Sequence, residues 1–232
     1  MRVKVVVSIN GRFVARSAAK VSIFDNSFLY AEGLFETFLV VNGKIHFAGI
    51  HLDRLYRGAK AIDIAIPASR KTIESWLVAT ARKHPDRILK LRLTISAGES
   101  ARWIGTQGKS QVIIIASPHE MPMHPFALWV SPNRIDQDSN FRQIKTLSYV
   151  IQALSLRQAK AHGCHDALLL NQRGQIAEVT SANIFWVRNG RIYTPPLSAG
   201  CLDGVTRRIV VREAHKAGFE VLEANSNLRG LL

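Results

Sequence analysis

The sequence predicts a mixed α/β (α+β) fold divided into two domains. Strand and helix patterns alternate along the chain, and both occur on each side of a proline-rich segment. That segment, residues 117–125, contains three prolines, which disfavour helix and strand alike. We therefore expect one domain over residues 1–117, a linker over 118–125 and a second domain over 126–232, with a ligand-binding cleft at the linker.

The first domain is predicted to contain two tight hairpins. Asn10-Gly11 and Asn42-Gly43 each stand between short apolar runs, and Asn-Gly is the preferred dipeptide of two-residue hairpin turns. Apolar side chains at three- and four-residue spacing predict helices, and a glycine-rich loop, 97–108, joins two long strands. The expected strands cover residues 3–7, 13–14, 35–41, 45–47, 88–96 and 111–116, and the expected helices cover 51–62 and 73–83.

The second domain is predicted to mix the two kinds of element again. A loop that carries Lys145 precedes an apolar helical stretch, and Gly218 is suited to cap the last helix. No internal repeat is visible. The expected strands cover residues 128–131, 167–170, 183–187, 191–194 and 219–222, and the expected helices cover 147–161 and 205–216.

Composition excludes several classes of protein. Hydrophobic residues make up 47% of the chain and charged residues 21%, as in an ordinary globular protein. No apolar run approaches the length of a membrane span, and Val3–Val7 is too short for a signal-peptide core. Cys164 and Cys201 have no metal-binding or redox spacing, so we expect a reducing cytoplasm, packing roles for both cysteines and no metal site.

The net charge of +14 is unusual and would by itself suggest a nucleic-acid partner. The basic residues are scattered, however, and aromatic residues are not interleaved with them as a base-stacking surface requires. We therefore expect no nucleic-acid and no membrane partner. The excess charge is interpreted as a solvated surface plus a few arginines directed at phosphate and carboxylate groups.

Two residues indicate cofactor chemistry. Lys145 stands before an apolar stretch, and an amine in apolar surroundings becomes a usable nucleophile near neutral pH. Glu178 lies among apolar and hydroxyl-bearing residues, and a buried carboxylate can hold a proton on a ring nitrogen. Together they suggest a Schiff base between Lys145 and pyridoxal phosphate, with Glu178 beside the pyridinium nitrogen. The alternative is a solvated lysine and a strand carboxylate facing water.

Six motifs occur in a fixed order and spacing. They are residues 30–37 (YAEGLFET), 51–55 (HLDRL), 144–149 (IKTLSY), 163–171 (GCHDALLLN), 178–185 (EVTSANIF) and 202–207 (LDGVTR). Each motif is weak alone, but six in register are specific. On these motifs the chain resembles the class IV pyridoxal-phosphate aminotransferases, a family that includes branched-chain and D-amino-acid aminotransferases and aminodeoxychorismate lyases.

The resemblance implies a small N-terminal domain, a larger C-terminal cofactor-binding domain, pyridoxal 5'-phosphate in the interdomain cleft, and a homodimer. It implies that Lys145 is the catalytic residue, that Arg54 binds phosphate and that Phe35 lines the substrate side. Tyr149 either bonds the cofactor's ring hydroxyl or packs in the core, and Arg102 is a candidate for binding a substrate carboxylate. The remaining cofactor-binding residues implied are Glu178, Ser181, Asn183, Leu202, Gly204, Val205 and Thr206, of which the last three stand at a predicted helix start that favours phosphate.

Three functions follow from the resemblance. The first is transfer of an amino group between an amino acid and a 2-oxo acid, which the motif containing Glu36 favours, since some lyases carry a hydroxyl residue there. The second is 4-amino-4-deoxychorismate lyase activity, which eliminates pyruvate. The third is an inactive remnant, because relatives normally continue beyond residue 232. We accordingly expect the C-terminal part to be incomplete, with an exposed sheet edge and weaker cofactor retention.

Overall fold

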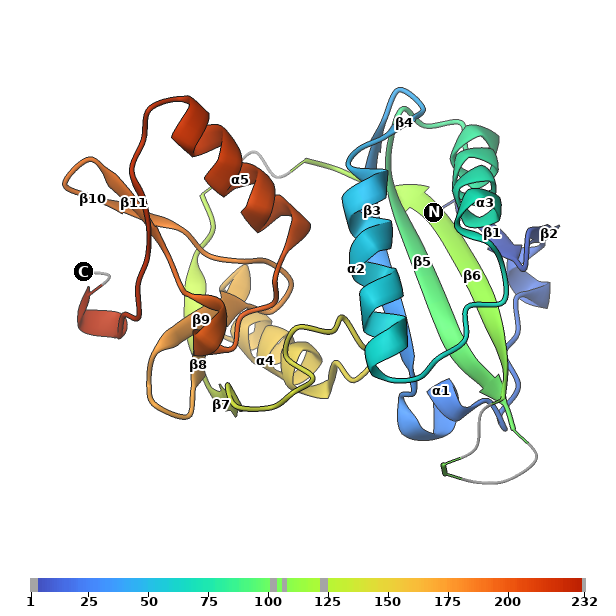
Figure 1. Ribbon diagram of the computed structural model, residues 1–232, viewed down its shortest axis with the longest axis horizontal. Helices are drawn as coiled ribbons and strands as arrows, with labels where there is room; N and C mark the ends of the chain where they lie inside the picture. Colours follow the sequence, from blue (N-terminus) through green and yellow to red (C-terminus); the bar gives the residue numbers. More distant parts are fainter. Residues whose placement is uncertain (1–3, 101–103, 106–107, 122–124, 231–232) are drawn as a thin grey trace. The chain divides into compact units, whose positions relative to one another are not determined.

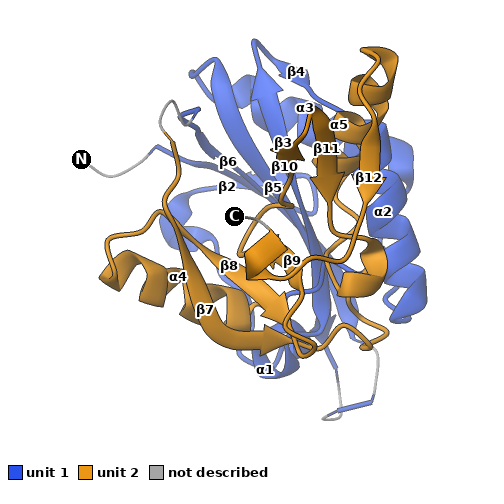
Figure 2. Ribbon diagram, turned by 90° about the vertical axis from the view of Figure 1, so that its left-hand side faces the viewer, with its two compact units in different colours: residues 1–122, 144–148 blue, residues 123–143, 149–232 orange. Residues whose placement is uncertain are grey.

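The computed structural model describes residues 4–100, 104–105, 108–121 and 125–230. The chain forms two compact units, which Figure 2 shows in different colours. Unit 1 consists of residues 1–122 together with 144–148, and unit 2 consists of residues 123–143 and 149–232. Both units contain strands and helices, so the mixed α/β class predicted from the sequence is confirmed.

Unit 1 is built on one six-stranded antiparallel sheet of order β2-β1-β6-β5-β3-β4. Its helices α2 and α3 lie across one face of this sheet (Figure 1). The strands are β1 Val6–Ile9, β2 Arg12–Val14, β3 Gly33–Val41, β4 Lys44–Ile45, β5 Ile88–Glu99 and β6 Lys109–Pro118, and the helices are η1 Arg16–Ala18, α1 Asn26–Tyr30, α2 Ala48–Ala61 and α3 Arg70–Lys83.

The core of unit 1 follows from strand alternation. Successive side chains of a strand point to opposite faces, so every second residue of β5 faces the helices. The buried side chains of this core include Leu91, Leu93 and Ile95 of β5, Leu52 and Leu55 of α2, and Ile73 and Leu77 of α3. The opposite face of β5 carries Arg92 and Thr94, so polar side chains lie on that side of the sheet.

Both predicted Asn-Gly hairpins are confirmed. Asn10-Gly11 joins β1 to β2 and Asn42-Gly43 joins β3 to β4, with positive φ at all four residues, as this tight turn requires. A third turn of the same kind, Asn189-Gly190, joins two strands of unit 2.

Unit 2 contains two three-stranded sheets, ordered β7-β8-β9 and β10-β11-β12. Helix α4 packs against β7 and β8, which are parallel, and α5 connects the parallel pair β11 and β12. The strands are β7 Leu128–Ile135, β8 Asp166–Asn171, β9 Ile176–Val179, β10 Trp186–Arg188, β11 Arg191–Thr194 and β12 Val221–Glu223, and the helices are α4 Val150–Ala161, η2 Leu197–Ala199, α5 Val205–Lys216 and η3 Leu228–Gly230.

Several predicted boundaries are wrong. The helix expected over 147–161 begins at Val150, the strand expected over 183–187 is observed only from Trp186 as β10, and α1 was not predicted. In α1 the Asp25 side chain accepts a hydrogen bond from Ser27 N–H, so a short capped turn forms without apolar periodicity. Within the described residues, none of the helices has the length and apolarity needed to cross a membrane.

Candidate functional site

Lys145 lies on a short extended segment of unit 1, not at the head of a helix. The Phe35 N–H donates to Lys145 O at 3.0 Å, and the Leu147 N–H donates to Gly33 O at 3.0 Å, so the segment pairs with the start of β3. A side chain at residue 33 would collide with this segment, because a Cβ there would lie 2.5 Å from Leu147 Cδ1. This pairing overturns the expected helix start and fixes the backbone of Lys145.

The amine of Lys145 faces an aromatic ring. Its Nζ lies 4.4 Å from the centroid of the Phe35 ring, and the guanidinium carbon of Arg92 lies 3.7 Å from the same centroid. Cations are attracted to the face of such a ring. Phe35 was predicted to line the substrate side. Its ring is buried and has two cationic neighbours, Lys145 and Arg92.

Arg54 lies in a buried cluster with Glu36 and His51. The Arg54 Nε donates to Glu36 Oε1 at 2.7 Å and Nη2 donates to Oε2 at 2.6 Å, while His51 Nδ1 lies 2.7 Å from Oε2. Burial raises the pKa of Glu36, but the hydrogen bonds from His51 and Arg54 and the nearby charges lower it, so the net pKa lies below the ordinary 4.5. The planar guanidinium is thereby held in a fixed orientation.

Glu178 lies on β9 of unit 2 and is only 7% exposed, so its predicted burial is confirmed. Its Oε1 accepts a hydrogen bond from Arg142 Nη2 at 2.5 Å, and its Oε2 accepts one from the Leu202 N–H at 2.9 Å. Buried polar groups are costly without partners, and these two donors satisfy both oxygens of the carboxylate.

The start of α5 is held by Asn183. The Asn183 Nδ2 donates to Leu202 O at 2.8 Å, and a Cβ at Gly204 would lie 1.9 Å from Asn183 Oδ1. Only glycine fits this close approach. Among the described side chains, none caps the start of α5. The first N–H groups of a helix have no acceptors within the helix. At this start Val205 is buried and Thr206 is exposed. Such a helix start is suited to an anion.

The structure places the predicted site residues in both units. Unit 1 holds Phe35, Arg54 and Lys145. Arg102 lies outside the described residues. The other predicted residues, all in unit 2, are Tyr149, Glu178, Ser181, Asn183, Leu202, Gly204, Val205 and Thr206. Tyr149 directly precedes α4 and is not one helical turn beyond Lys145, contrary to the sequence-based expectation.

Sequence reasoning missed two arginines. Arg92 alternates with the core residues of β5, and that alternation could have placed it on the same face of the sheet as Phe35. Arg142 stands only three residues before Lys145, but nothing in its local pattern indicates its pairing with Glu178. Within the described part of the chain, no three His, Cys, Asp or Glu side chains are grouped to hold a metal ion.

The chain belongs to the class IV aminotransferase family. The sequence model of that family, described as "Amino-transferase class IV", matches residues 33–232, a range that contains every residue of the clusters above. Members of this family depend on pyridoxal 5'-phosphate. The family predicted from the six motifs is therefore confirmed.

The relatives of this chain are named for different activities. A putative branched-chain-amino-acid aminotransferase of Methanocaldococcus jannaschii is 33% identical and aligns over 97% of this chain and 80% of its own. An aminodeoxychorismate lyase of Bacillus subtilis is 30% identical, over 97% of this chain and 79% of its own. The crystal structure of the branched-chain aminotransferase of Thermoproteus uzoniensis with norvaline has a TM-score of 0.89 at 27% identity, and the match covers 97% of this chain and 79% of that one.

Proposed function

We propose that this protein is a pyridoxal-phosphate-dependent aminotransferase that moves an amino group between an amino acid and a 2-oxo acid, with Lys145 as its catalytic residue. The observation that carries the proposal is the buried Glu178 carboxylate, whose two oxygens are fixed by Arg142 and Leu202. Carboxylates are rarely buried, so a carboxylate with a purely structural role is unexpected on this otherwise apolar strand. A carboxylate that pairs with the nitrogen of a buried pyridine ring must itself be buried.

The residues present fit the cofactor group by group. Its aldehyde requires an amine, for which Lys145 is the candidate; its ring nitrogen requires a carboxylate, for which Glu178 is the candidate. Its phosphate requires N–H donors or cations. The uncapped start of α5, with Gly204 leaving room for close approach, supplies the former, and Arg54 is the candidate cation. Ser181, Asn183, Leu202, Val205 and Thr206 border the same segments and are proposed to complete the binding set, with Tyr149 as a further candidate.

When bound, pyridoxal phosphate withdraws electrons from the substrate α-carbon. Glu178 accepts a hydrogen bond at the ring nitrogen and thereby keeps a proton there. Lys145 is the general base that removes the proton from the substrate α-carbon. The Phe35 ring contacts both the Lys145 amine and the Arg92 guanidinium, so Phe35 and Arg92 are proposed to face the substrate.

The test is covalent capture of the cofactor by reduction. Wild-type protein is mixed with pyridoxal phosphate, treated with borohydride and digested for mass spectrometry. We expect a visible absorbance band that borohydride removes, with the added mass on Lys145. Lys145→Ala should lose the absorbance band and the added mass. Lys160→Ala, which changes an exposed lysine on α4, should keep the band and the added mass. Equal capture in Lys145→Ala, or none in the wild type, would overturn the proposal.

The second candidate is aminodeoxychorismate lyase activity, favoured by the Bacillus subtilis relative. Both reactions require the same lysine and carboxylate, so the capture experiment does not separate them. Pyruvate release from aminodeoxychorismate without a 2-oxo acid acceptor would identify the lyase. Donor-dependent amination of a 2-oxo acid would identify the aminotransferase, which the presence of Glu36 and the Methanocaldococcus jannaschii relative favour.

The partner proposed for this chain is a second copy of itself. Apolar side chains are exposed in and just before α1: Phe28 is 68% exposed, Ile23 63% and Phe24 58%. A cluster of this kind on one short segment is typical of a contact surface. Sedimentation equilibrium should show a dimer that Phe24→Ser with Phe28→Ser weakens, while Phe219→Ser, an exposed site in unit 2, should not. A monomeric wild type would contradict the proposal.

A reducing compartment such as the cytoplasm is proposed from the cysteines. Cys164 and Cys201 are both free thiols. Burial raises the pKa of the Cys201 thiol to about 11, so this thiol stays protonated and unreactive at neutral pH.

A further inference from the structure

Resting on the proposed function, we propose that Arg142 is a positioning residue for the reaction, which acts by orienting the Glu178 carboxylate. Arg142 belongs to none of the six motifs, and its role is read from contacts within unit 2.

The side chain of Arg142 is anchored at two atoms. Its Nη2 donates to Glu178 Oε1 at 2.5 Å, and its Nε donates to Gly200 O at 2.7 Å. Both side chains of this ion pair are mostly buried. A guanidinium can donate in two fixed directions at once, which the ammonium of a lysine does not reproduce.

The second oxygen of Glu178 is held by the loop that Arg142 anchors. Glu178 Oε2 accepts from the Leu202 N–H at 2.9 Å, and Arg142 bonds the carbonyl of Gly200 two residues earlier. Gly200 has a φ of +91°, and a Cβ there would lie 2.9 Å from Gln137 Cα, so the bend at this point is specific to glycine. Arg142 therefore fixes one oxygen directly and the other through the loop.

The neighbouring Gln143 extends the same arrangement. Its Nε2 donates to Cys201 O at 3.1 Å and its Oε1 accepts from the Asp203 N–H at 3.0 Å. Gly200, Cys201, Leu202 and Asp203 thus each have a backbone group bound by Arg142, Gln143 or Glu178. This loop leads directly into α5, so the two residues next to the Lys145 segment organise both the carboxylate and the helix start.

Charge explains why the carboxylate depends on this arginine. Removing one partner of a buried ion pair is strongly unfavourable for the partner that remains. Without Arg142, the Glu178 carboxylate loses the donor that fixes Oε1 and turns toward another donor. It then becomes a poorer acceptor for a protonated ring nitrogen, even though Glu178 itself is still present.

The experiment measures the protonation of the ring nitrogen, together with the rate of α-proton exchange. Wild type, Arg142→Gln and Arg173→Gln are loaded with pyridoxal phosphate labelled with ¹⁵N in the ring. The ¹⁵N chemical shift is recorded from about pH 6 to about pH 9, around the pH at which an acid–base catalyst operates. Arg173 is the matched control, since its ion pair with Asp138 is exposed and lies in the same unit.

We expect the ring nitrogen of the cofactor to lose its proton at a lower pH in Arg142→Gln than in the wild type. We also expect exchange of the amino-acid α-proton in D₂O to slow by roughly 10- to 100-fold, as when a residue that orients a site ligand is removed. Borohydride capture at Lys145 should persist. Arg173→Gln should match the wild type in every measurement.

Unchanged ¹⁵N titration and exchange in Arg142→Gln, with capture at Lys145 intact, would overturn the inference and leave the proposed function standing. No capture in the wild type would instead reject the proposed function. If Arg142→Gln does not fold, Arg142→Lys is compared with Arg173→Lys: slower exchange and an altered ¹⁵N titration in Arg142→Lys alone support the inference, and equality overturns it.

Discussion

Glu36 is a carboxylate with no exposure to solvent that is nevertheless kept charged. Burial alone would raise the pKa of Glu36, but hydrogen bonds from His51 and Arg54 reverse the shift. A pKa that is lower in the folded chain than in the unfolded chain means that the carboxylate stabilises folding above pH 4.5. That contribution disappears as the pH falls through the lowered folded-state pKa.

We therefore expect Glu36→Gln to destabilise the protein at pH 7 by about 3–5 kcal/mol, because it removes the charged member of a buried ion pair with Arg54. The difference between variant and wild type should shrink as the pH falls below 4.5. Urea unfolding across this pH range measures both effects. Glu213→Gln is the control: hydrogen bonds from Arg212 and Lys216 lower the pKa of that carboxylate too, but it is exposed, and a much smaller change is expected. An equal loss in both variants would contradict the argument.

For single residues, the sequence predicted only the properties that depend on neighbours along the chain. Glu178 was placed among apolar neighbours by inspection of its segment, and the structure confirms its burial. The partner Arg142 could not be found in the same way, because its contact with Glu178 depends on the path of a distant loop. Arg54 was expected to bind phosphate, a role that stays a prediction, but its pairing with Glu36 from another element was not foreseen.

Among the elements, hairpins were predictable and helix starts were not. Asn-Gly turns depend on two adjacent residues, so both were located from the sequence. Leu147 continues the apolar pattern of α4 backward, which predicted helix through a segment that in fact pairs with β3. That pairing joins residues far apart in the sequence, and such tertiary contacts override local propensity.

The start of α5 provides a prediction at the scale of an element. Gly204→Ala should push the Asn183 side chain away and break its bond to Leu202 O, at a cost of about 1–3 kcal/mol. Asn183→Ala removes the colliding atom. The double variant should therefore be more stable than the sum of the two single changes, with a coupling energy of about 0.5–3 kcal/mol.

Urea unfolding of the four proteins without cofactor measures this coupling. Gly49→Ala on α2 is the control, since a Cβ there meets only Arg70 at an ordinary 3.7 Å. That variant should be neutral or slightly more stable, because alanine favours helix over glycine. Additive effects at residues 183 and 204 would show that the two side chains do not collide.

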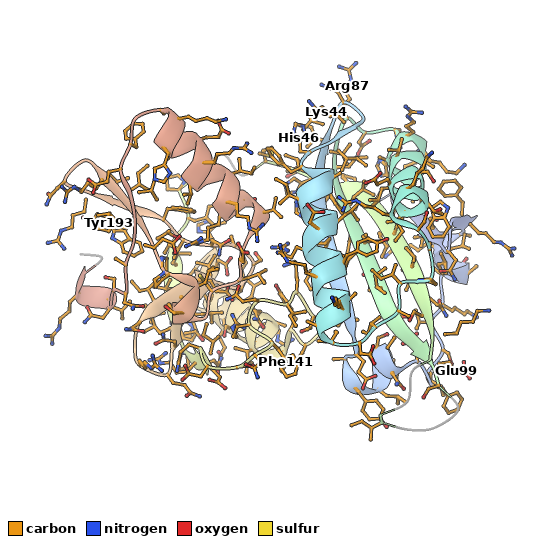
Figure 3. All side chains as sticks on the ribbon, in the orientation of Figure 1. Lys44, His46, Arg87, Glu99, Phe141 and Tyr193 are labelled. Carbon is orange, nitrogen blue, oxygen red and sulfur yellow. The ribbon has the colours of Figure 1, made fainter. Side chains whose placement is uncertain are left out.

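For the molecule as a whole, the surplus of positive charge is the most unusual property. In Figure 3, Lys44, His46 and Arg87 project from the same end of the unit 1 sheet, where the Asn42 N–H donates to Arg87 O at 2.8 Å. Repulsion among like charges destabilises a compact state, and salt screens it. We expect the protein to be more stable at moderate ionic strength than in dilute buffer.

Raising NaCl from about 0.05 M to about 0.5 M, where the screening length falls below 10 Å, should raise Tm by about 2–4 °C, the shift expected for a gain of about 1 kcal/mol. Lys44→Glu with Arg87→Glu lowers the net charge by four, from +14 to +10. The same increase in NaCl should raise the Tm of this variant by less than it raises the Tm of the wild type. An equal gain would indicate that salt acts on apolar burial instead of charge.

A gene for this chain cannot be divided between the two units by a single cut. The polypeptide passes from one unit to the other after residues 122, 143 and 148. Separating the coding sequence at residue 122 would place β3 on one product and residues 144–148, which pair with it, on the other. Phe35 and Lys145 would then be translated as parts of different polypeptides. Recovery of cofactor capture from two such half-genes would therefore report whether that short pairing can form between separate chains.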